Sequence, residues 1–277
     1  MKHLRAIEYL MVEKTPLRSI AKRLIARLGL GSFEFRYRIE ALQRMQYAYI
    51  MYQAAKLATK LRQPRISVLE FGVAGGAGLL WMERYAEEIE RIFPVEIEIY
   101  GFDTGAGLPP PSDYRDLPYH WKEGFFAMDK AALETKLKRA KLVMGNVADT
   151  CATFVRDHNP APIAAVAHDL DFYSSTVDGL KLFDVNTTHL MPRMFCYFDD
   201  TIGSDTELYS DFTGERLAIE DFNTANQMRK IAVPHYLRAR EGLGTWRHQI
   251  WVCHLFDHPD YNRFVGEENQ QLSLAGQ

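Results

Sequence analysis

The chain has 277 residues, of which 47% are hydrophobic and 25% are charged, and its formal net charge is -3. This composition is typical of a folded globular protein, and the lack of a basic excess argues against nucleic acid as a partner. The three cysteines are scattered and form no CxxC pair, which argues against a disulfide framework and a zinc site and fits a reducing cytoplasm.

Residues 1–60 read as helical, and we expect them to form a lid or interface segment before a main domain over residues 61–265. Leu17, Ile20, Leu24, Ile25 and Leu28 share one face of a basic amphipathic helix. The favoured interpretation is a helix docked on its own domain or on another subunit, which leaves a homo-oligomer open. A membrane-surface helix is the alternative.

Strand and helix patterns alternate through the middle of the chain. The predicted strands cover residues 66–71, 96–102, 141–144, 163–169 and 194–199. The predicted helices between them cover residues 79–93, 130–139, 147–157 and 175–190. This alternation predicts an α/β fold with a doubly wound, mostly parallel sheet, the Rossmann-like architecture.

The pattern changes after residue 200. A helix is predicted over residues 216–232, and a closing hairpin is predicted from strands at 236–240 and 249–256. The hairpin brings the sheet to seven strands and places one antiparallel strand at its edge. Residues 266–277 are expected to form a flexible tail. No stretch reaches the roughly 20 apolar residues of a membrane span, so no integral membrane segment is expected.

The first strand runs into a glycine-rich turn, VLEFGVAGGAG over residues 68–78. Glycines let the backbone turn tightly and approach a ligand. The next strand ends at Asp103, where a carboxylate can accept hydrogen bonds from ribose hydroxyls. Together these features predict a nucleotide-binding βαβ unit. The predicted cofactor-binding residues here are Glu70, Gly72, Val73, Ala74, Gly75, Gly76, Gly78, Asp103 and Thr104.

Glu70 bears on which nucleotide binds. A dinucleotide places its pyrophosphate against the glycine-rich turn, and a carboxylate there would repel it. S-adenosylmethionine suits Glu70 better, because its methionine end carries an ammonium beside a sulfonium. We expect Glu70 to act through the loop or through water, and a purely local structural role is the alternative.

A long loop over residues 105–128, rich in proline and aromatic residues, leaves the second strand. Ligands bind at this end of an open α/β sheet, so the loop is a candidate lid or substrate wall. His120 and Trp121 either face the substrate or pack the loop itself.

Four carboxylates follow the fourth and fifth strands: Asp169, Asp171, Asp199 and Asp200. The ends of neighbouring parallel strands meet, so these acids would repel one another unless some stay protonated or a cation binds. Oxygen ligands suit Mg²⁺, with Mn²⁺ or Ca²⁺ as alternatives. Helix capping and an Asx turn are the structural explanations that compete with a metal site.

These segments resemble the macrocin O-methyltransferase family. The resemblance rests on EFGV at 70–73, GFDTGAGLP at 101–109, HDLDFYSST at 168–176 and the acid pair at 199–200. Members of that family are class I, metal-dependent enzymes that use S-adenosylmethionine to methylate sugar hydroxyls of macrolides, aminocoumarins and polysaccharides. The chain departs from the usual pattern at His168, at Leu170 where glycine is usual, and at Gly78 where serine is common.

The resemblance covers about residues 40–205 and implies site roles. Asp169, Asp199 and Asp200 would bind Mg²⁺, and Asp171 would be the general base. Asp103 would hold the ribose, and the adenine would lie near Gly145, Asn146 and Val147. A nearby metal is expected to lower the pKa of Asp171 and keep it ionised.

The predicted function is Mg²⁺-assisted methyl transfer from S-adenosylmethionine to a hydroxyl of a sugar or another vicinal-diol small molecule, in natural-product or polysaccharide biosynthesis. A non-catalytic methyltransferase-like binding or assembly subunit is the first alternative. A nicotinamide-dependent oxidoreductase is the second, and Glu70 and the downstream acids argue against it.

Overall fold

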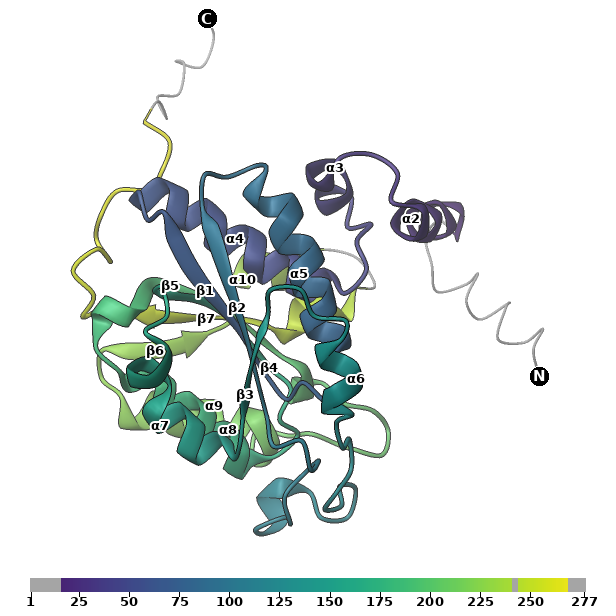
Figure 1. The fold of residues 1–277 in the computed structure, drawn as a ribbon, viewed down its shortest axis with the longest axis vertical. Coiled ribbons are helices and arrows are strands. Elements are labelled where there is room, and N and C mark those ends of the chain that lie inside the picture. Colours follow the sequence, from purple (N-terminus) through teal and green to yellow (C-terminus); the bar gives the residue numbers. More distant parts are fainter. Residues whose placement is uncertain (1–15, 241–243, 269–277) are drawn as a thin grey trace, which may run out of the picture.

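The computed structural model describes residues 16–240 and 244–268 and shows a seven-stranded sheet with the order β3-β2-β1-β4-β5-β7-β6 (Figure 1). The strands are β1 (Arg65–Phe71), β2 (Glu96–Asp103), β3 (Lys141–Met144), β4 (Ile163–His168), β5 (Leu190–Phe198), β6 (Arg229–Ala232) and β7 (Ile250–Leu255). The first five are parallel, and β7 runs antiparallel between β5 and β6. The predicted fold class is confirmed, and the antiparallel strand lies one position inside the edge.

Helices cover both faces of the sheet. They are α2 (Pro16–Leu28), α3 (Phe33–Arg38), α4 (Met45–Leu61), α5 (Ala77–Glu90), α6 (Lys130–Glu134), α7 (Val147–His158), α8 (Tyr173–Leu180), α9 (Gly214–Ala225) and α10 (His235–Arg238). Figure 1 shows α4 and α5 on one face and α7, α8 and α9 on the other. Within the described ranges, no helix is both long and apolar enough to cross a membrane.

Two predictions in the last third of the chain are wrong. The helix expected through residue 232 ends at Ala225, and residues 229–232 form β6. Asn223 fixes this strand, because its side chain accepts from Ile231 N at 2.7 Å and donates to Ile231 O at 2.8 Å. The strand expected at 236–240 is instead the short helix α10, which begins directly after Pro234, a residue that favours helix starts.

Two other expectations concern element ends. The helix expected over 175–190 ends at Leu180 and is followed by two short 3₁₀ turns. Most of the tail expected at 266–277 lies outside the described residues, as do residues 1–15.

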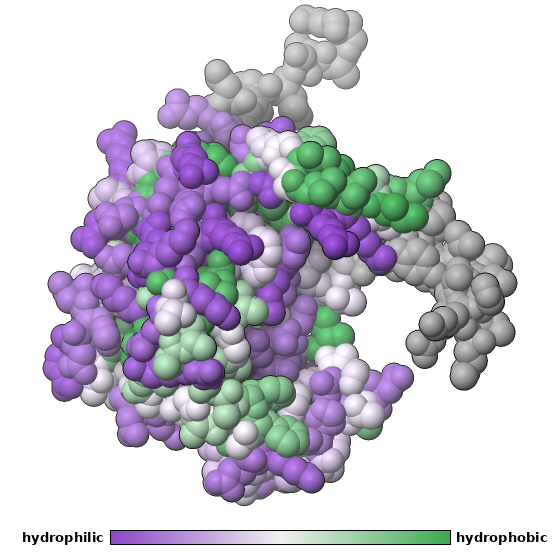
Figure 2. Space-filling model, turned by 45° about the vertical axis from the view of Figure 1, so that its right-hand side comes forward, coloured by the Kyte–Doolittle hydropathy of each residue, from purple (hydrophilic) through white to green (hydrophobic). Residues whose placement is uncertain are grey.

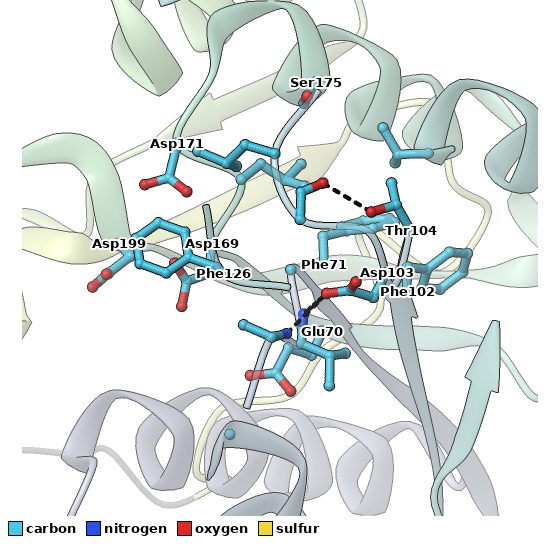
Figure 3. A pocket seen from close by; sticks show the side chains of 18 of the residues that line it. Glu70, Phe71, Phe102, Asp103, Thr104, Phe126, Asp169, Asp171, Ser175 and Asp199 are labelled. Atoms are coloured by element: carbon cyan, nitrogen blue, oxygen red, sulfur yellow. Dashed lines mark hydrogen bonds between the residues drawn. The ribbon is translucent and has the colours of Figure 1, made fainter. Parts of the chain in front are cut away.

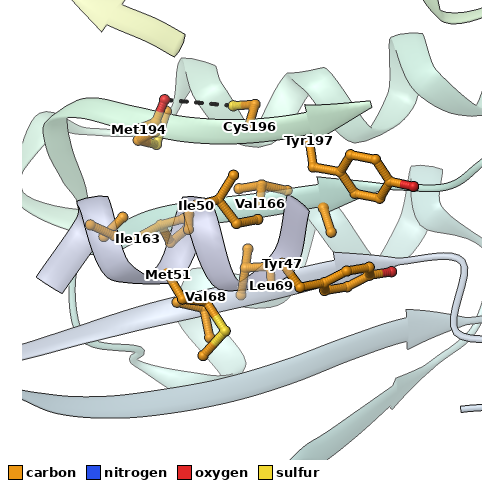
Figure 4. Packing of buried hydrophobic residues seen from close by; sticks show 14 of the residues in the cluster. Tyr47, Ile50, Met51, Val68, Leu69, Ile163, Val166, Met194, Cys196 and Tyr197 are labelled. Atoms are coloured by element: carbon orange, nitrogen blue, oxygen red, sulfur yellow. Dashed lines mark hydrogen bonds between the residues drawn. The ribbon is translucent and has the colours of Figure 1, made fainter. Parts of the chain in front are cut away.

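The helix α4 packs directly on the sheet (Figure 4). Its Tyr47, Ile50 and Met51 are fully buried in the same hydrophobic cluster as residues of β1, β4 and β5. Arg44, with φ of 45°, lies in the left-handed region directly before the helix. The chain therefore enters α4 through a sharp turn, and the first turn of the helix lies over the end of β1.

The helix α2 presents its apolar face to solvent. Leu17, Ile20, Leu24 and Leu28 are each more than half exposed, and Figure 2 shows a hydrophobic patch in this part of the surface. Within the described residues, the face predicted to dock is therefore left uncovered by the chain's own domain.

Candidate active site

A pocket of about 350 Å³ opens at the carboxyl ends of the parallel strands, a size within the roughly 300–1,000 Å³ range of small-molecule sites. Every predicted site residue lines it except Gly76. A Cβ at Gly76 would lie 2.2 Å from Leu133 of α6, so this glycine serves helix packing. The remaining wall includes Arg44, Tyr47, Leu108, Pro109, Trp121, Phe126 and Glu207.

Asp103 braces the glycine-rich turn. Its Oδ2 accepts hydrogen bonds from the backbone N–H of Val73 at 2.9 Å and of Ala74 at 2.8 Å, and its Oδ1 accepts from Gly105 N at 2.6 Å. A carboxylate has about four acceptor positions. Three are used, so one remains for a ligand hydroxyl while the same side chain fixes the turn.

Gly72 lets the turn approach the acids. It has φ of 81°, and a Cβ there would lie 1.7 Å from the carbonyl oxygen of Asp169. The backbone N–H of Asp169 also donates to Phe71 O at 3.0 Å. The end of β1 and the end of β4 are thus in direct contact, and only glycine fits between them.

Glu70 is buried beneath the turn and is held by a residue from α4. The Tyr47 hydroxyl donates to Glu70 Oε1 at 2.5 Å, while Oε2 is buried without a hydrogen-bond partner. A Cβ at Gly78 would lie 1.6 Å from Glu70 Oε1, which explains glycine at this position. Burial raises the pKa of Glu70 to about 7, against the opposing effects of the Tyr47 hydrogen bond and the charge of Arg44.

The four aspartates gather at one end of the pocket. Figure 3 shows the carboxylates of Asp169, Asp171 and Asp199 on one side and Asp103 on the other. Burial, followed by the charges of Asp199 and Asp200, raises the pKa of Asp169 well above its usual range. Burial and the charge of Asp199 raise the pKa of Asp200 to about 7. Burial and crowding therefore favour the protonated forms of these acids unless a cation binds among them.

Hydrogen bonds orient the acid pair after β5. Asp200 accepts from Asp171 N and from the Tyr209 hydroxyl, both at 2.9 Å. Asp199 accepts from the Tyr197 hydroxyl and from Gln249 Nε2 at 2.9 Å. In the part of the chain that the structure describes, no three His, Cys, Asp or Glu side chains already converge as a metal site.

The lowered pKa expected for Asp171 depends on a bound metal ion and stays a prediction. The protein groups around it do not lower its pKa: burial, followed by the charges of Asp200 and Asp199, raises the pKa to about 9. The prediction relied on a metal ion, whose charge would act in the opposite direction. Its backbone also lies in the left-handed region, with φ of 58°, a strained conformation that is common at functional sites.

Glu215 is an acid that the sequence did not single out. It is fully buried at the start of α9, where its Oε2 accepts from Asp200 N at 2.9 Å and its Oε1 has no partner. Burial and the charge of Asp200 raise its pKa well above the usual range. Glu215 therefore fixes the backbone at Asp199 and Asp200. This role depends on a contact between two residues that are 15 positions apart in the chain.

The loop over residues 105–128 forms a wall of the pocket. Asp116 anchors it to α8 by accepting from Ser174 N and Ser174 Oγ, each at 2.9 Å. Trp121 lines the pocket and donates from Nε1 to the Tyr209 hydroxyl at 3.1 Å. His120 does not line it and instead faces Glu207 at 3.8 Å.

His168 is a core residue. Its ring stacks on Phe198 with centroids 4.2 Å apart, and burial lowers its pKa to about 3. Neither ring nitrogen has a hydrogen-bond partner. The neutral imidazole thus fills the space beneath the acids and does not reach the pocket.

No family model and no curated protein matches the chain. Solved structures do share its fold. The calicheamicin methyltransferase CalS11 aligns with a TM-score of 0.54 and 19% identity over 88% of this chain and 94% of its own. The O-methyltransferase NovP aligns with a TM-score of 0.51 and 15% identity over 76% of this chain and 79% of its own. The chain therefore shares its overall fold with these two methyltransferase structures.

Proposed function

We propose that this protein is an S-adenosylmethionine-dependent O-methyltransferase that methylates a hydroxyl of a sugar or another vicinal-diol small molecule with the help of Mg²⁺. The observation that carries the proposal is a single pocket that joins the glycine-rich turn and Asp103 to the four aspartates after β4 and β5. The likeness in fold to CalS11 and NovP, both described as methyltransferases, supports it.

The cofactor would lie along the end of β1. Asp103 keeps one acceptor position for the ribose, and the turn before α7, at Asn146, borders the pocket on the adenine side. The methionine end would lie toward Glu70. This orientation points the sulfonium methyl at the aspartates.

The donor set fits a hard divalent cation. Asp169, Asp199 and Asp200 would hold it, because buried carboxylates with raised pKa values are stabilised by a positive charge among them. Mn²⁺ and Ca²⁺ are alternatives for the same donors. When bound, the cation would polarise the acceptor hydroxyl and screen the neighbouring carboxylates.

The residues of the chain would then position the reactants and move one proton. Asp171 would take the proton from the acceptor hydroxyl. The oxygen would attack the methyl carbon in line, the carbon–sulfur bond would break, and its electron pair would stay on sulfur to give S-adenosylhomocysteine. Leu108, Trp121 and Phe126 line the pocket and would exclude water from the reacting atoms.

Calorimetric titration with S-adenosylhomocysteine and with NAD⁺ tests the cofactor. We expect the first to bind and the second not to bind. Tight NAD⁺ binding without a response to S-adenosylhomocysteine would contradict the proposal and favour an oxidoreductase. Binding of S-adenosylhomocysteine without methyl transfer to any of a panel of sugar diols would favour the non-catalytic alternative.

Chelation tests the metal. With a methylated acceptor in hand, EDTA should abolish transfer, and added Mg²⁺ should restore it. Transfer that is unaffected by EDTA would show that the aspartates have a structural role.

A further inference from the structure

The first part of the chain is basic, although the chain as a whole is acidic. Residues 1–30 contain seven Lys or Arg residues and two Glu residues, which is a formal net charge of +5, whereas the full chain carries -3. The remaining residues therefore carry -8. A charge asymmetry of this kind is typical of a segment that binds a polyanionic surface.

The helix α2 combines this charge with an outward apolar stripe. The stripe consists of Leu17, Ile20, Leu24 and Leu28, which are 80%, 57%, 54% and 59% exposed. An amphipathic helix of a globular protein normally turns such a stripe toward the core. A contiguous apolar surface that faces water instead marks an interaction site, and Figure 2 shows the hydrophobic patch in this part of the molecule.

The apolar surface continues beyond the end of α2. Leu30 is 50% exposed and Phe35 of α3 is 47% exposed. Gly31, with φ of 85°, lets the Phe35 ring lie against the connecting turn, because a Cβ at Gly31 would lie 2.6 Å from that ring. The stripe on α2 and this aromatic side chain therefore belong to one outward apolar surface.

Basic residues border the stripe on α2. The helix contains four Lys or Arg residues and no acid. Helical spacing places Arg23 and Arg27 along one border of the stripe and Lys22 along the other. Long basic side chains at such borders can reach anionic headgroups while their stems cover apolar surface. This arrangement is that of a helix lying in the plane of a membrane surface.

The length of α2 agrees with an in-plane position. Its 13 residues extend over about 20 Å, whereas the hydrocarbon core of a bilayer is about 30 Å thick. The helix is thus too short to span the bilayer and long enough to rest its stripe in the headgroup region.

Two other occupants fit the surface less well. A nucleic acid would pair with the basic residues but would leave the leucine stripe in water. A two-fold dimer formed through this face would place α2 against its own copy. Two helices with four basic residues each and no acid would then repel one another. An anionic lipid surface satisfies the charge and the apolar stripe together.

We propose that α2 and the turn after it attach this protein to the surface of a bilayer that contains anionic phospholipids. Leu17, Ile20, Leu24, Leu28, Leu30 and Phe35 enter the headgroup region, and the basic residues of α2 contact the lipid phosphates. This attachment is separate from the pocket and does not depend on the cofactor or the acceptor.

Co-sedimentation of the full chain with vesicles tests the proposal. The probes are vesicles of phosphatidylcholine alone and of phosphatidylcholine mixed in equal parts with phosphatidylglycerol. The protein should bind the mixed vesicles more tightly, and added salt should weaken that binding because exposed charges are screened. A wild-type protein that stays in the supernatant with the mixed vesicles would overturn the proposal.

A double variant tests the apolar stripe. Leu24→Ser with Leu28→Ser should lower the partition coefficient on mixed vesicles at least about tenfold. Both side chains are more than half exposed, so the fold should persist, which a thermal melt checks. Phe212→Ser is the matched control, because Phe212 is 75% exposed and lies just before α9. This control should bind vesicles like the wild type.

A charge variant tests the basic border. Arg27→Gln should lower the partition coefficient about fivefold, the contribution of one basic residue near an anionic surface. Arg156→Gln is its control: Arg156 is 75% exposed on α7, which covers the face of the sheet opposite α4 (Figure 1). Equal losses in Arg27→Gln and Arg156→Gln would overturn the role of α2 and indicate a diffuse charge effect.

Sedimentation equilibrium separates the lipid surface from a second copy. If the wild type is a dimer that becomes a monomer in the double leucine variant, and neither binds vesicles, the proposal is overturned and the occupant of the stripe is another copy of the chain. The α2 variants should all bind S-adenosylhomocysteine like the wild type. A wild type that binds vesicles but not S-adenosylhomocysteine would refute the proposed function and leave the membrane attachment standing.

Discussion

The burial of Glu70 predicts how the free energy of unfolding depends on pH. Burial raises its pKa to about 7 in the folded protein, whereas in the unfolded chain the value returns to the ordinary range near 4.3. A carboxyl whose pKa is raised on folding contributes stability below the unfolded value and loses it as the pH rises through the folded value. Glu70 therefore stabilises the fold in acid and not at neutral or higher pH.

The magnitude follows from the two pKa values. The folded and unfolded pKa values differ by about 2.7, which gives wild-type protein roughly 2.5 kcal/mol of proton-linked stability at about pH 5, of which almost none remains at about pH 8. Glutamine at this position has the same shape and does not titrate. The free energy of unfolding of Glu70→Gln, relative to wild type, should therefore rise by about 2.5 kcal/mol between these two pH values.

The measurement is urea unfolding of both proteins at the two pH values, without cofactor and with EDTA. Taking the difference between variant and wild type cancels the titration of groups that do not interact with Glu70, whereas Asp169 and Asp103 do interact with it through their charges. Glu90→Gln is a control of opposite sign: burial alone would raise the pKa of Glu90, but hydrogen bonds from Arg139 and Ile97 bring it below the usual range. A Glu70→Gln difference that does not change with pH would refute the assignment of a raised pKa to Glu70.

Three further predictions concern the pocket. Asp103→Ala should weaken S-adenosylhomocysteine binding, measured by calorimetry, by about 1–3 kcal/mol, the cost of a lost charged hydrogen bond. Asp103 also holds three backbone N–H groups of the turn. A thermal melt of the variant would show whether the loss comes instead from a collapsed turn. Asp199→Asn should abolish metal binding and methyl transfer together, whereas Asp171→Asn should leave metal and cofactor bound and slow turnover by roughly 10²–10⁴-fold. Metal titration and single-turnover rates of both variants test this difference. Equal effects of the two variants would contradict the assignment of Asp199 as a metal ligand and Asp171 as the base. Gly78→Ala should displace Glu70 and Tyr47, because its Cβ would lie 1.6 Å from Glu70 Oε1 and 2.7 Å from the Tyr47 hydroxyl, so a variant with unchanged stability and cofactor affinity would contradict the packing described for this end of the pocket.

Local sequence signals were sufficient wherever a residue's role depends on its own strand or turn. Each of the strands β1 to β5 is an apolar run that ends at or is followed by an acidic residue or a glycine, which marks where the strand ends. Asp103 and the acids after β4 and β5 were found because the ends of parallel strands meet at one edge. The helix ending at Ala225 was misread because its boundary depends on Asn223, whose amide binds the backbone of the next strand.

The residues that the sequence did not reveal act across long distances in the chain. Tyr47 lies 23 residues before its partner Glu70, and a tyrosine on an amphipathic helix is more typical of core packing than of a site. Glu215 lies at the start of α9 and accepts a hydrogen bond from Asp200 N, 15 residues earlier in the chain. Neither contact has a local pattern that could mark it.

The departure from the resembled family at Gly78 connects these observations. A serine at position 78 would place its Cβ too close to Glu70 and to the Tyr47 hydroxyl. A serine at position 78 is therefore incompatible with the position that Tyr47 takes on α4. In this chain the space above Glu70 is taken by a hydroxyl from a helix that precedes the sheet. The same helix brings Arg44 to the pocket. The packing of this end of the pocket therefore depends on how α4 docks, a property encoded by its buried face and not by the glycine-rich motif alone.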